Sequence, residues 1–104
     1  MTRGEVWWAA FPKPAGRRPV VLLSRDESYR VRQLVTIASV TTAVRGIPVE
    51  VPLGPGDGLP RACAVNCDTL TTIPKTFLVH QITRLSPAKL QQLDDAIKFA
   101  LDLP

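Results

Sequence analysis

Two arginines that lead directly into a short apolar segment, Arg17-Arg18-Pro19-Val20-Val21-Leu22-Leu23, constrain the fold more than any other stretch of this 104-residue sequence. A residue before proline favours extended backbone, and proline is tolerated at the first residue of a strand. Residues 20–23 contain no polar side chain, so the strand that they predict is covered on both faces. The segment therefore predicts an inner strand of a sheet, with Arg18 held at the entrance of that strand.

Further strand patterns, separated by turns rich in glycine and proline, fill the chain up to residue 85. Alternating and β-branched segments predict strands at residues 5–11, 34–44, 47–53, 62–73 and 77–85. Pro48 and Pro52 place the 47–53 strand at a sheet edge. Residues 12–16 are expected to close a hairpin with a basic tip, residues 27–33 to form a surface loop, and residues 54–60 to form the clearest loop.

The last part of the chain carries a helical pattern. Ser86 is a natural N-cap with Pro87 at the first helical position, and apolar residues then recur at helical spacing at Leu90, Leu93 and Ile97. This pattern predicts an amphipathic helix over residues 87–101. The chain is therefore expected to be mainly β with a C-terminal helix, and its length predicts a single domain over residues 1–104.

Two of the predicted strands place distinctive side chains on defined faces. In the 34–44 strand, alternation puts Val35, Ile37, Ser39 and Thr41 on one face, which begins apolar and ends in two hydroxyl groups. That strand is thus expected to leave the core and enter a polar site. In the first strand, neighbouring tryptophans at positions 7 and 8 must face opposite ways, so one belongs to the core and the other lines a groove or packs under a loop.

The net charge of +4 arises entirely in the first half of the chain. Residues 1–50 hold eight Lys/Arg against four Asp/Glu, whereas residues 51–104 hold five of each. Nearly all the excess is arginine, whose planar guanidinium suits phosphate. This distribution suggests nucleic acid as a partner, although a solvated basic face is the commoner origin of so modest an excess. No signal-peptide pattern or membrane span is found, so a cytoplasmic location without membrane contact is expected.

The residues that could hold a metal or perform acid–base catalysis are few. If Cys63 and Cys67 share a strand, their Cα atoms lie about 13 Å apart, beyond disulfide reach, so both are expected to be reduced thiols. Together with His80 they do not make a zinc site, and His80 is interpreted as a surface residue. The sequence also lacks a catalytic Ser-His-Asp or Cys-His set, paired acids and a phosphate-binding glycine loop.

Arginine and hydroxyl groups at strand ends are what remains for chemistry. Such groups can stabilise the charge on a reacting phosphate when the nucleophile belongs to the substrate, as the 2′-hydroxyl of RNA does. That reaction would need neither a metal nor another cofactor.

Five motifs, in order and with their spacing, resemble the MazF/PemK (Kid) toxin family. They are Arg3-Gly4-Glu5-Val6-Trp7-Trp8, Arg18-Pro19-Val20-Val21-Leu22-Leu23-Ser24, Val40-Thr41-Thr42 with Gly46 and Glu50, Val65-Asn66-Cys67-Asp68, and the closing helix. The resemblance implies an SH3-like, partly open β-barrel that forms a homodimer. It also implies a metal-independent endoribonuclease that cuts single-stranded RNA at short sequences, leaves 2′,3′-cyclic phosphate and 5′-hydroxyl ends, and is restrained by a cognate antitoxin.

The resemblance also assigns residues. Arg18 matches the family's catalytic arginine and Thr41 its catalytic threonine. Because arginine stays protonated, Arg18 is best interpreted as an electrostatic clamp, with Thr41 donating a hydrogen bond to a phosphate oxygen. Asp68 matches a site aspartate of the PemK branch, although a simple turn or cap hydrogen bond would explain it equally. The RNA contacts expected beside them are Arg17, Ser39, Thr42, Arg45 and Asn66.

One departure and two alternatives accompany this interpretation. Family members often carry a glutamate, and some a histidine, in the loop before the arginine, but residues 13–17 contain neither. The general base is therefore unidentified. A CcdB-like toxin of the same fold that inhibits gyrase without catalysis is a second hypothesis, against which the Arg18 and Thr41 pair counts. A third is an SH3-like module that binds RNA without cutting it.

Overall fold

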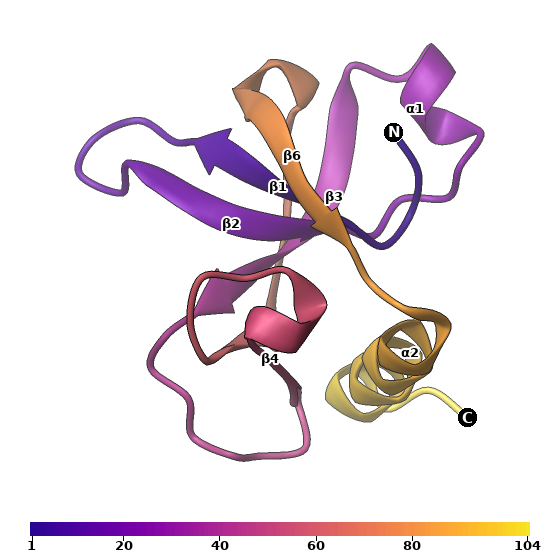
Figure 1. The fold of residues 1–104 in the computed structure, drawn as a ribbon. Helices are drawn as coiled ribbons and strands as arrows, with labels where there is room; N and C mark the ends of the chain where they lie inside the picture. Colours follow the sequence, from indigo (N-terminus) through magenta and orange to yellow (C-terminus); the bar gives the residue numbers. More distant parts are fainter.

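Six strands pair into one curled antiparallel sheet in the computed structural model, which describes residues 1–104 (Figure 1). The strands are β1 (Glu5–Ala10), β2 (Arg17–Leu22), β3 (Leu34–Thr41), β4 (Glu50–Leu53), β5 (Cys63–Pro74) and β6 (Leu78–Arg84), and their order in the sheet is β4-β5-β3-β2-β1-β6. The sheet forms a half-barrel, which confirms the mainly β, partly open barrel with a C-terminal helix. β4 lies at an edge, where Pro52 predicted it.

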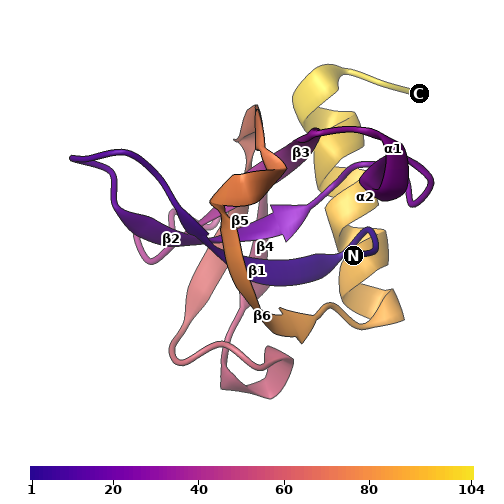
Figure 2. The ribbon, with the colours of Figure 1, turned by 90° about the horizontal axis from the view of Figure 1, so that it is seen from above.

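The C-terminal helix α2 spans Pro87–Leu101, the range predicted from its periodicity. The Ser86 hydroxyl accepts a hydrogen bond from the Lys89 N–H at 3.2 Å and so caps the helix. Leu93 and Ala96 are buried against the sheet. Figure 2 shows α2 on one side of the sheet, with the β1–β2 hairpin projecting away from it.

The prediction of a loop over residues 27–33 was wrong in part, because Ser28–Val31 form the single-turn helix α1. Tyr29 buries its ring in the core and the Ser28 hydroxyl donates to the Arg25 carbonyl at 2.8 Å. Burial of the tyrosine, rather than helix propensity, therefore accounts for this turn. Two 3₁₀ turns, Pro55–Asp57 and Lys75–Phe77, lie in the connections on either side of β5.

Two apolar clusters cover the two faces of the sheet. The larger includes Val21 and Leu93 and lies between the sheet and α2, whereas the smaller includes Val20 and Ile37 on the other face. Val20 and Val21 are both fully buried, which confirms that β2 is covered on both faces. The strand thus provides a rigid base for the arginines that precede it.

Strands β3 and β4 are shorter than predicted, since residues 42–49 between them form a loop. The buried Glu50 carboxylate accepts hydrogen bonds from the backbone N–H groups of Arg45 and Gly46, each at 2.9 Å. Gly46 has φ +68°, a backbone conformation that favours glycine. These bonds hold residues 42–49 in a loop, although strand was predicted for residues 42–44 and 47–49 on either side of Arg45 and Gly46.

The pairing of β3 with β5 is interrupted near its middle. Ala38 lies opposite Leu70 but the next residue, Ser39, lies opposite Asn66, so residues 67–69 form a bulge. Cys63 and Cys67 are both on β5, buried and unbonded, as expected. No helix has the length and apolar character needed to span a membrane.

Candidate functional site

A pocket of about 440 Å³ opens at the hydroxyl end of β3. Because β3 lies between β2 and β5 in the sheet, the pocket has one wall from the β1–β2 hairpin and another from the chain that enters β5. The hairpin contributes Trp8, Ala15, Arg17, Arg18 and Pro19, β3 and its end contribute Val40, Thr41 and Thr42, and the other wall consists of Leu59, Pro60, Arg61 and Cys63. Three arginines and no carboxylate line this space.

The two hairpin arginines are oriented by different neighbours. The Arg18 Nε donates to the Ala15 carbonyl at 3.3 Å, which ties the side chain to its own hairpin loop. The Arg17 guanidinium carbon lies 5.6 Å from the centroid of the Trp8 ring, a cation–π contact. Neither guanidinium forms an ion pair with a carboxylate of the protein, so both are available to bind an anionic ligand.

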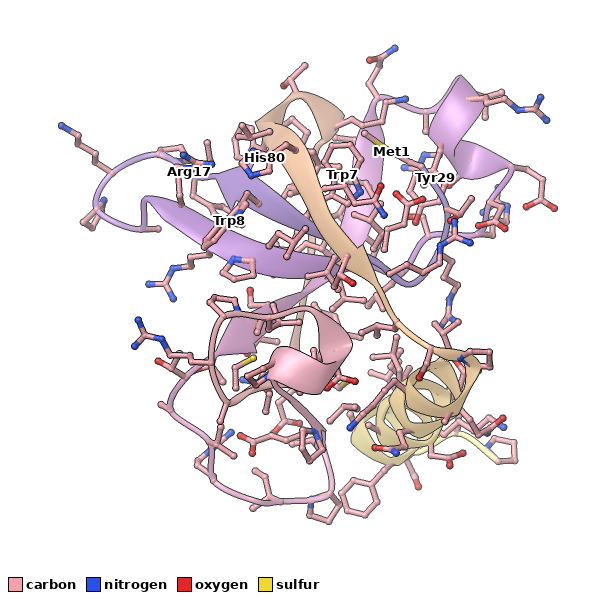
Figure 3. The ribbon with its side chains drawn as sticks, in the orientation of Figure 1. Met1, Trp7, Trp8, Arg17, Tyr29 and His80 are labelled. Carbon is pink, nitrogen blue, oxygen red and sulfur yellow. The ribbon has the colours of Figure 1, made fainter.

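The two tryptophans lie in different regions, as alternation required (Figure 3). Trp8 lies beside Arg17 on the hairpin and lines the pocket, whereas the Trp7 Nε1 donates to Glu5 Oε1 at 2.8 Å and its ring packs against the smaller apolar cluster. The prediction that one of them lines a groove is therefore confirmed for Trp8.

The Thr41 hydroxyl is set up as a donor. Its Oγ1 accepts a hydrogen bond from the Ala43 backbone N–H at 3.0 Å. An oxygen that already accepts in this way directs its own hydrogen elsewhere, and Thr41 lines the pocket. Thr42 lines the pocket beside it. The strand end thus offers one oriented hydroxyl and a second nearby.

Four predicted site residues do not line the pocket. Ser39 lies between β2 and β5, opposite Val20 and Asn66, and Arg45 pairs with Glu50, 3.5 Å from Nε to Oε2. The Asn66 side-chain oxygen accepts from the Asp68 backbone N–H at 3.0 Å, and Asp68 itself is exposed in the β5 bulge. The roles assigned to these four residues stay predictions, and so does the alternative that the Asp68 carboxylate serves a turn or cap.

Sequence reasoning missed Arg61, which lines the wall opposite the hairpin. It follows the glycine- and proline-rich loop at residues 54–60 and comes two residues before β5 begins. The signal that singled out Arg18, a cation at a loop-to-strand junction, was therefore also present at Arg61.

No carboxylate or imidazole, the side chains that most often accept a proton near neutral pH, lines the pocket. Burial, with a smaller effect from Asp57, raises the pKa of the Cys63 thiol, so this group stays protonated. His80 is exposed on β6 and is not part of the lining. No group of three or more His, Cys, Asp or Glu side chains is arranged to hold a metal ion.

Two buried carboxylates, both outside the pocket, are saturated with donors. Burial alone would raise the pKa of Glu5, but hydrogen bonds from Trp7, Thr2 and Arg84 outweigh it and lower the pKa below 4.5. Burial also acts to raise the pKa of Glu50, and the Arg45 and Gly46 donors likewise lower it below 4.5. Both carboxylates therefore fix backbone and side chains rather than face the pocket.

Comparisons with known proteins identify the family. A family model described as PemK-like, MazF-like toxin of type II toxin–antitoxin system matches residues 2–101. Probable endoribonuclease MazF5 of Mycobacterium tuberculosis is 40% identical over 101 residues, which cover 96% of this chain and 92% of that protein.

Solved structures agree. The Mycobacterium tuberculosis toxin MazF-mt6 superposes with a TM-score of 0.89 at 35% identity, covering 96% of this chain and 98% of that chain. An endoribonuclease in complex with its cognate antitoxin, from a mycobacterial species, superposes with a TM-score of 0.88 at 30% identity. The match covers 100% of this chain and 97% of that chain. These matches confirm the predicted family, fold and endoribonuclease class. The chain belongs to the PemK-like, MazF-like family of toxins from type II toxin–antitoxin systems.

Proposed function

We propose that residues 1–104 act as a single domain that cuts single-stranded RNA as the toxin of a toxin–antitoxin system. The observation that carries this proposal is the meeting of Arg18 and Thr41 in one pocket that contains no carboxylate. Membership of a toxin family whose relatives are named endoribonucleases supports the same conclusion. The reaction is an internal transesterification that needs no metal or other cofactor.

In this reaction the RNA 2′-oxygen attacks the neighbouring phosphorus while the bond from phosphorus to the 5′-oxygen breaks. The products are a 2′,3′-cyclic phosphate and a 5′-hydroxyl. Arg18 donates hydrogen bonds to the non-bridging oxygens as negative charge develops there, and the Thr41 hydroxyl donates to the same phosphate. Positive charge and an oriented donor thus stabilise the transition state.

Proton transfer is assigned to solvent, since no carboxylate or imidazole lines the pocket. A water accepts the proton of the 2′-hydroxyl, and a water protonates the departing 5′-oxygen. Arg17 and Thr42 hold the RNA backbone next to the reacting phosphate. The roles proposed from sequence for Ser39, Arg45, Asn66 and Asp68 would require RNA contacts outside this pocket.

The partners proposed are single-stranded RNA, a cognate antitoxin and a second copy of the chain, and the compartment is the cytoplasm. The structural relative that was solved with its cognate antitoxin supports an antitoxin as a partner. Co-expression with the antitoxin gene would test this partner, and light scattering of the purified toxin would test the dimer. The gyrase-inhibiting alternative is not favoured, because the relatives are named endoribonucleases.

Incubating the purified protein with an unstructured RNA in EDTA tests the proposal directly. Fragments with 2′,3′-cyclic phosphate and 5′-hydroxyl ends are expected. The Arg18→Ala variant is expected to remain folded and to yield no detectable fragments in the time that the wild type needs to cut the RNA. A requirement for magnesium, or intact RNA together with inhibited supercoiling, would refute the mechanism. RNA that stays bound and uncut over a long incubation would support the non-cleaving binding module instead.

A further inference from the structure

We infer that Arg61 binds a second phosphate of the RNA, adjacent to the scissile phosphate held by Arg18. The candidate site would then hold two consecutive phosphates between opposite walls rather than one. This inference deepens the proposed function and rests on it.

The turn that presents Arg61 is firmly built. The Gly54 N–H donates to the Asp57 carboxylate at 3.0 Å, and the Leu59 N–H donates to the Gly54 carbonyl at 3.2 Å. Leu59 is 3% exposed and belongs to the larger apolar cluster. Gly58 has φ +93°, and a Cβ there would lie 2.6 Å from the Thr83 hydroxyl, so the turn requires glycine. The backbone on which Arg61 sits is thus fixed before any ligand arrives.

The Arg61 side chain has no partner within the protein. It is exposed, forms no ion pair and makes no side-chain hydrogen bond. Arg17 and Arg18 line the same pocket with no carboxylate beside them. Three guanidinium groups around one space repel one another, and an anion bound between them relieves that repulsion. The arrangement therefore favours a ligand that carries more than one negative charge.

The position of Arg61 favours a neighbouring phosphate over the scissile one. Arg18 and Thr41 belong to the hairpin wall and the β3 strand end, whereas Arg61 comes from the wall on the other side of β3. A volume of about 440 Å³ falls within the range of roughly 300–1,000 Å³ typical of pockets that hold a small organic ligand. Such a space holds a nucleotide unit with a phosphate on each side.

Salt-dependent binding of an uncleavable RNA tests this inference. The probe is a fluorescent single strand with 2′-O-methyl groups throughout, which contains the cleavage sequence mapped for the wild-type enzyme. Arg61→Ala is expected to weaken binding at low salt and to reduce the slope of log K against log salt by about 0.7, the value for one lost phosphate contact on a single strand. Arg61→Lys, which keeps the charge, is expected to restore most of the slope.

Arg32→Ala is the matched control, because Arg32 is also an exposed arginine without an ion pair but does not line the pocket. Its slope is expected to equal that of the wild type. Circular dichroism and thermal melting of each variant establish that the fold is retained. An unchanged slope for a folded Arg61→Ala protein would overturn the inference.

Neutral methylphosphonate linkages then locate the contact. A methylphosphonate next to the scissile linkage is expected to weaken wild-type binding but to add little to the Arg61→Ala defect. If the non-additive linkage is instead the scissile one, Arg61 shares the phosphate of Arg18 and the inference is wrong. Failure of the wild-type protein to cut the corresponding natural RNA would count against the proposed function itself, which keeps the two failures distinct.

Discussion

Arginines in two regions of this molecule have opposite surroundings. Outside the pocket, three arginines each reach a carboxylate at 2.9–3.5 Å, in the pairs Arg3–Asp94, Arg45–Glu50 and Arg84–Glu5. Within the pocket, Arg17, Arg18 and Arg61 have no acidic neighbour in the lining. The total charge excess of the chain therefore says less about a binding site than do the positions at which arginines have no carboxylate partner. The paired arginines hold the fold together, whereas three of the arginines without an ion pair surround the space proposed for phosphate.

The largest effect is expected from Arg18→Ala. It removes the donor proposed to face the reacting phosphate, so the cleavage rate is expected to fall by roughly 10³-fold, the upper end for loss of one such donor. Rates are measured with a fluorescent RNA under single-turnover conditions. Arg3→Ala is the matched control, because it breaks a surface ion pair with Asp94 and is expected to leave the rate unchanged. Equal rates for Arg18→Ala and the wild type would erase the distinction between the two groups of arginines.

Thr41→Val is expected to have the next largest effect. Valine keeps the shape of the side chain but removes the hydroxyl that Ala43 orients, so the rate is expected to fall by about 10²-fold. Thr41→Ser, which keeps the hydroxyl, is expected to retain most of the activity. A fully active valine variant would leave the arginines as the sole catalytic groups.

Glu5→Gln tests the paired region through stability. The amide can no longer serve the Thr2, Trp7 and Arg84 donors as a buried carboxylate does, so the free energy of unfolding is expected to fall by about 1–3 kcal/mol. Urea denaturation followed by tryptophan fluorescence provides the measurement. Cleavage per folded molecule should stay at the wild-type rate. A stable variant with impaired cleavage would place Glu5 in the catalytic machinery and contradict the comparison.

The same carboxylates determine how stability depends on pH. Because the pKa values of Glu5 and Glu50 lie below 4.5 in the folded protein, the unfolded chain binds protons first as the pH falls. Their stabilising contribution is present above pH 4.5 and is lost as the pH falls through the folded pKa values. Glu50→Gln is therefore expected to flatten the curve of unfolding free energy against pH in this range. An unaltered curve would show that the Glu50 contacts with the 42–49 loop carry little energy.

The smallest effect is expected from Arg30→Ala. Arg30 is an exposed arginine of α1 that lacks an ion pair and does not line the pocket, so the cleavage rate should change by less than about twofold. This variant tests whether an arginine contributes to cleavage merely because it has no ion pair, or only when it also lines the pocket. A large loss of activity would mean that the RNA path extends over α1.

Much of the fold could be predicted because it depends on the local spacing of apolar residues, turns and caps along the chain. The α2 helix, the β1–β2 hairpin and the buried faces of β2 follow from spacing, caps and proline, and each was predicted. These are features of a single segment and need no knowledge of its neighbours. Arg18 and Thr41 were assigned to one site by the family resemblance, and both line the pocket.

The remainder depends on contacts between segments. α1 exists because Tyr29 is buried by distant residues, and the 42–49 loop is shaped by the Glu50 side chain. Arg61 faces the pocket because Asp57 caps a turn and Leu59 anchors it in the core. Local periodicity predicts none of these contacts. The one available signal was the position of Arg61 at a loop-to-strand junction, like that of Arg18.

The bulge at residues 67–69 has a mechanical consequence. On one side of it, β5 pairs with Ser39, Val40 and Thr41 beside the pocket; on the other side, it pairs with residues 34–38. A continuous ladder of backbone hydrogen bonds would couple these two halves of β3 to a single rigid register. Here β2 supplies that continuity instead, because it pairs with Ile37, Ala38 and Ser39 in unbroken register across the interruption. The bulge therefore displaces residues 67–69 of β5 from the ladder, while β3 runs uninterrupted to Thr41 at the pocket.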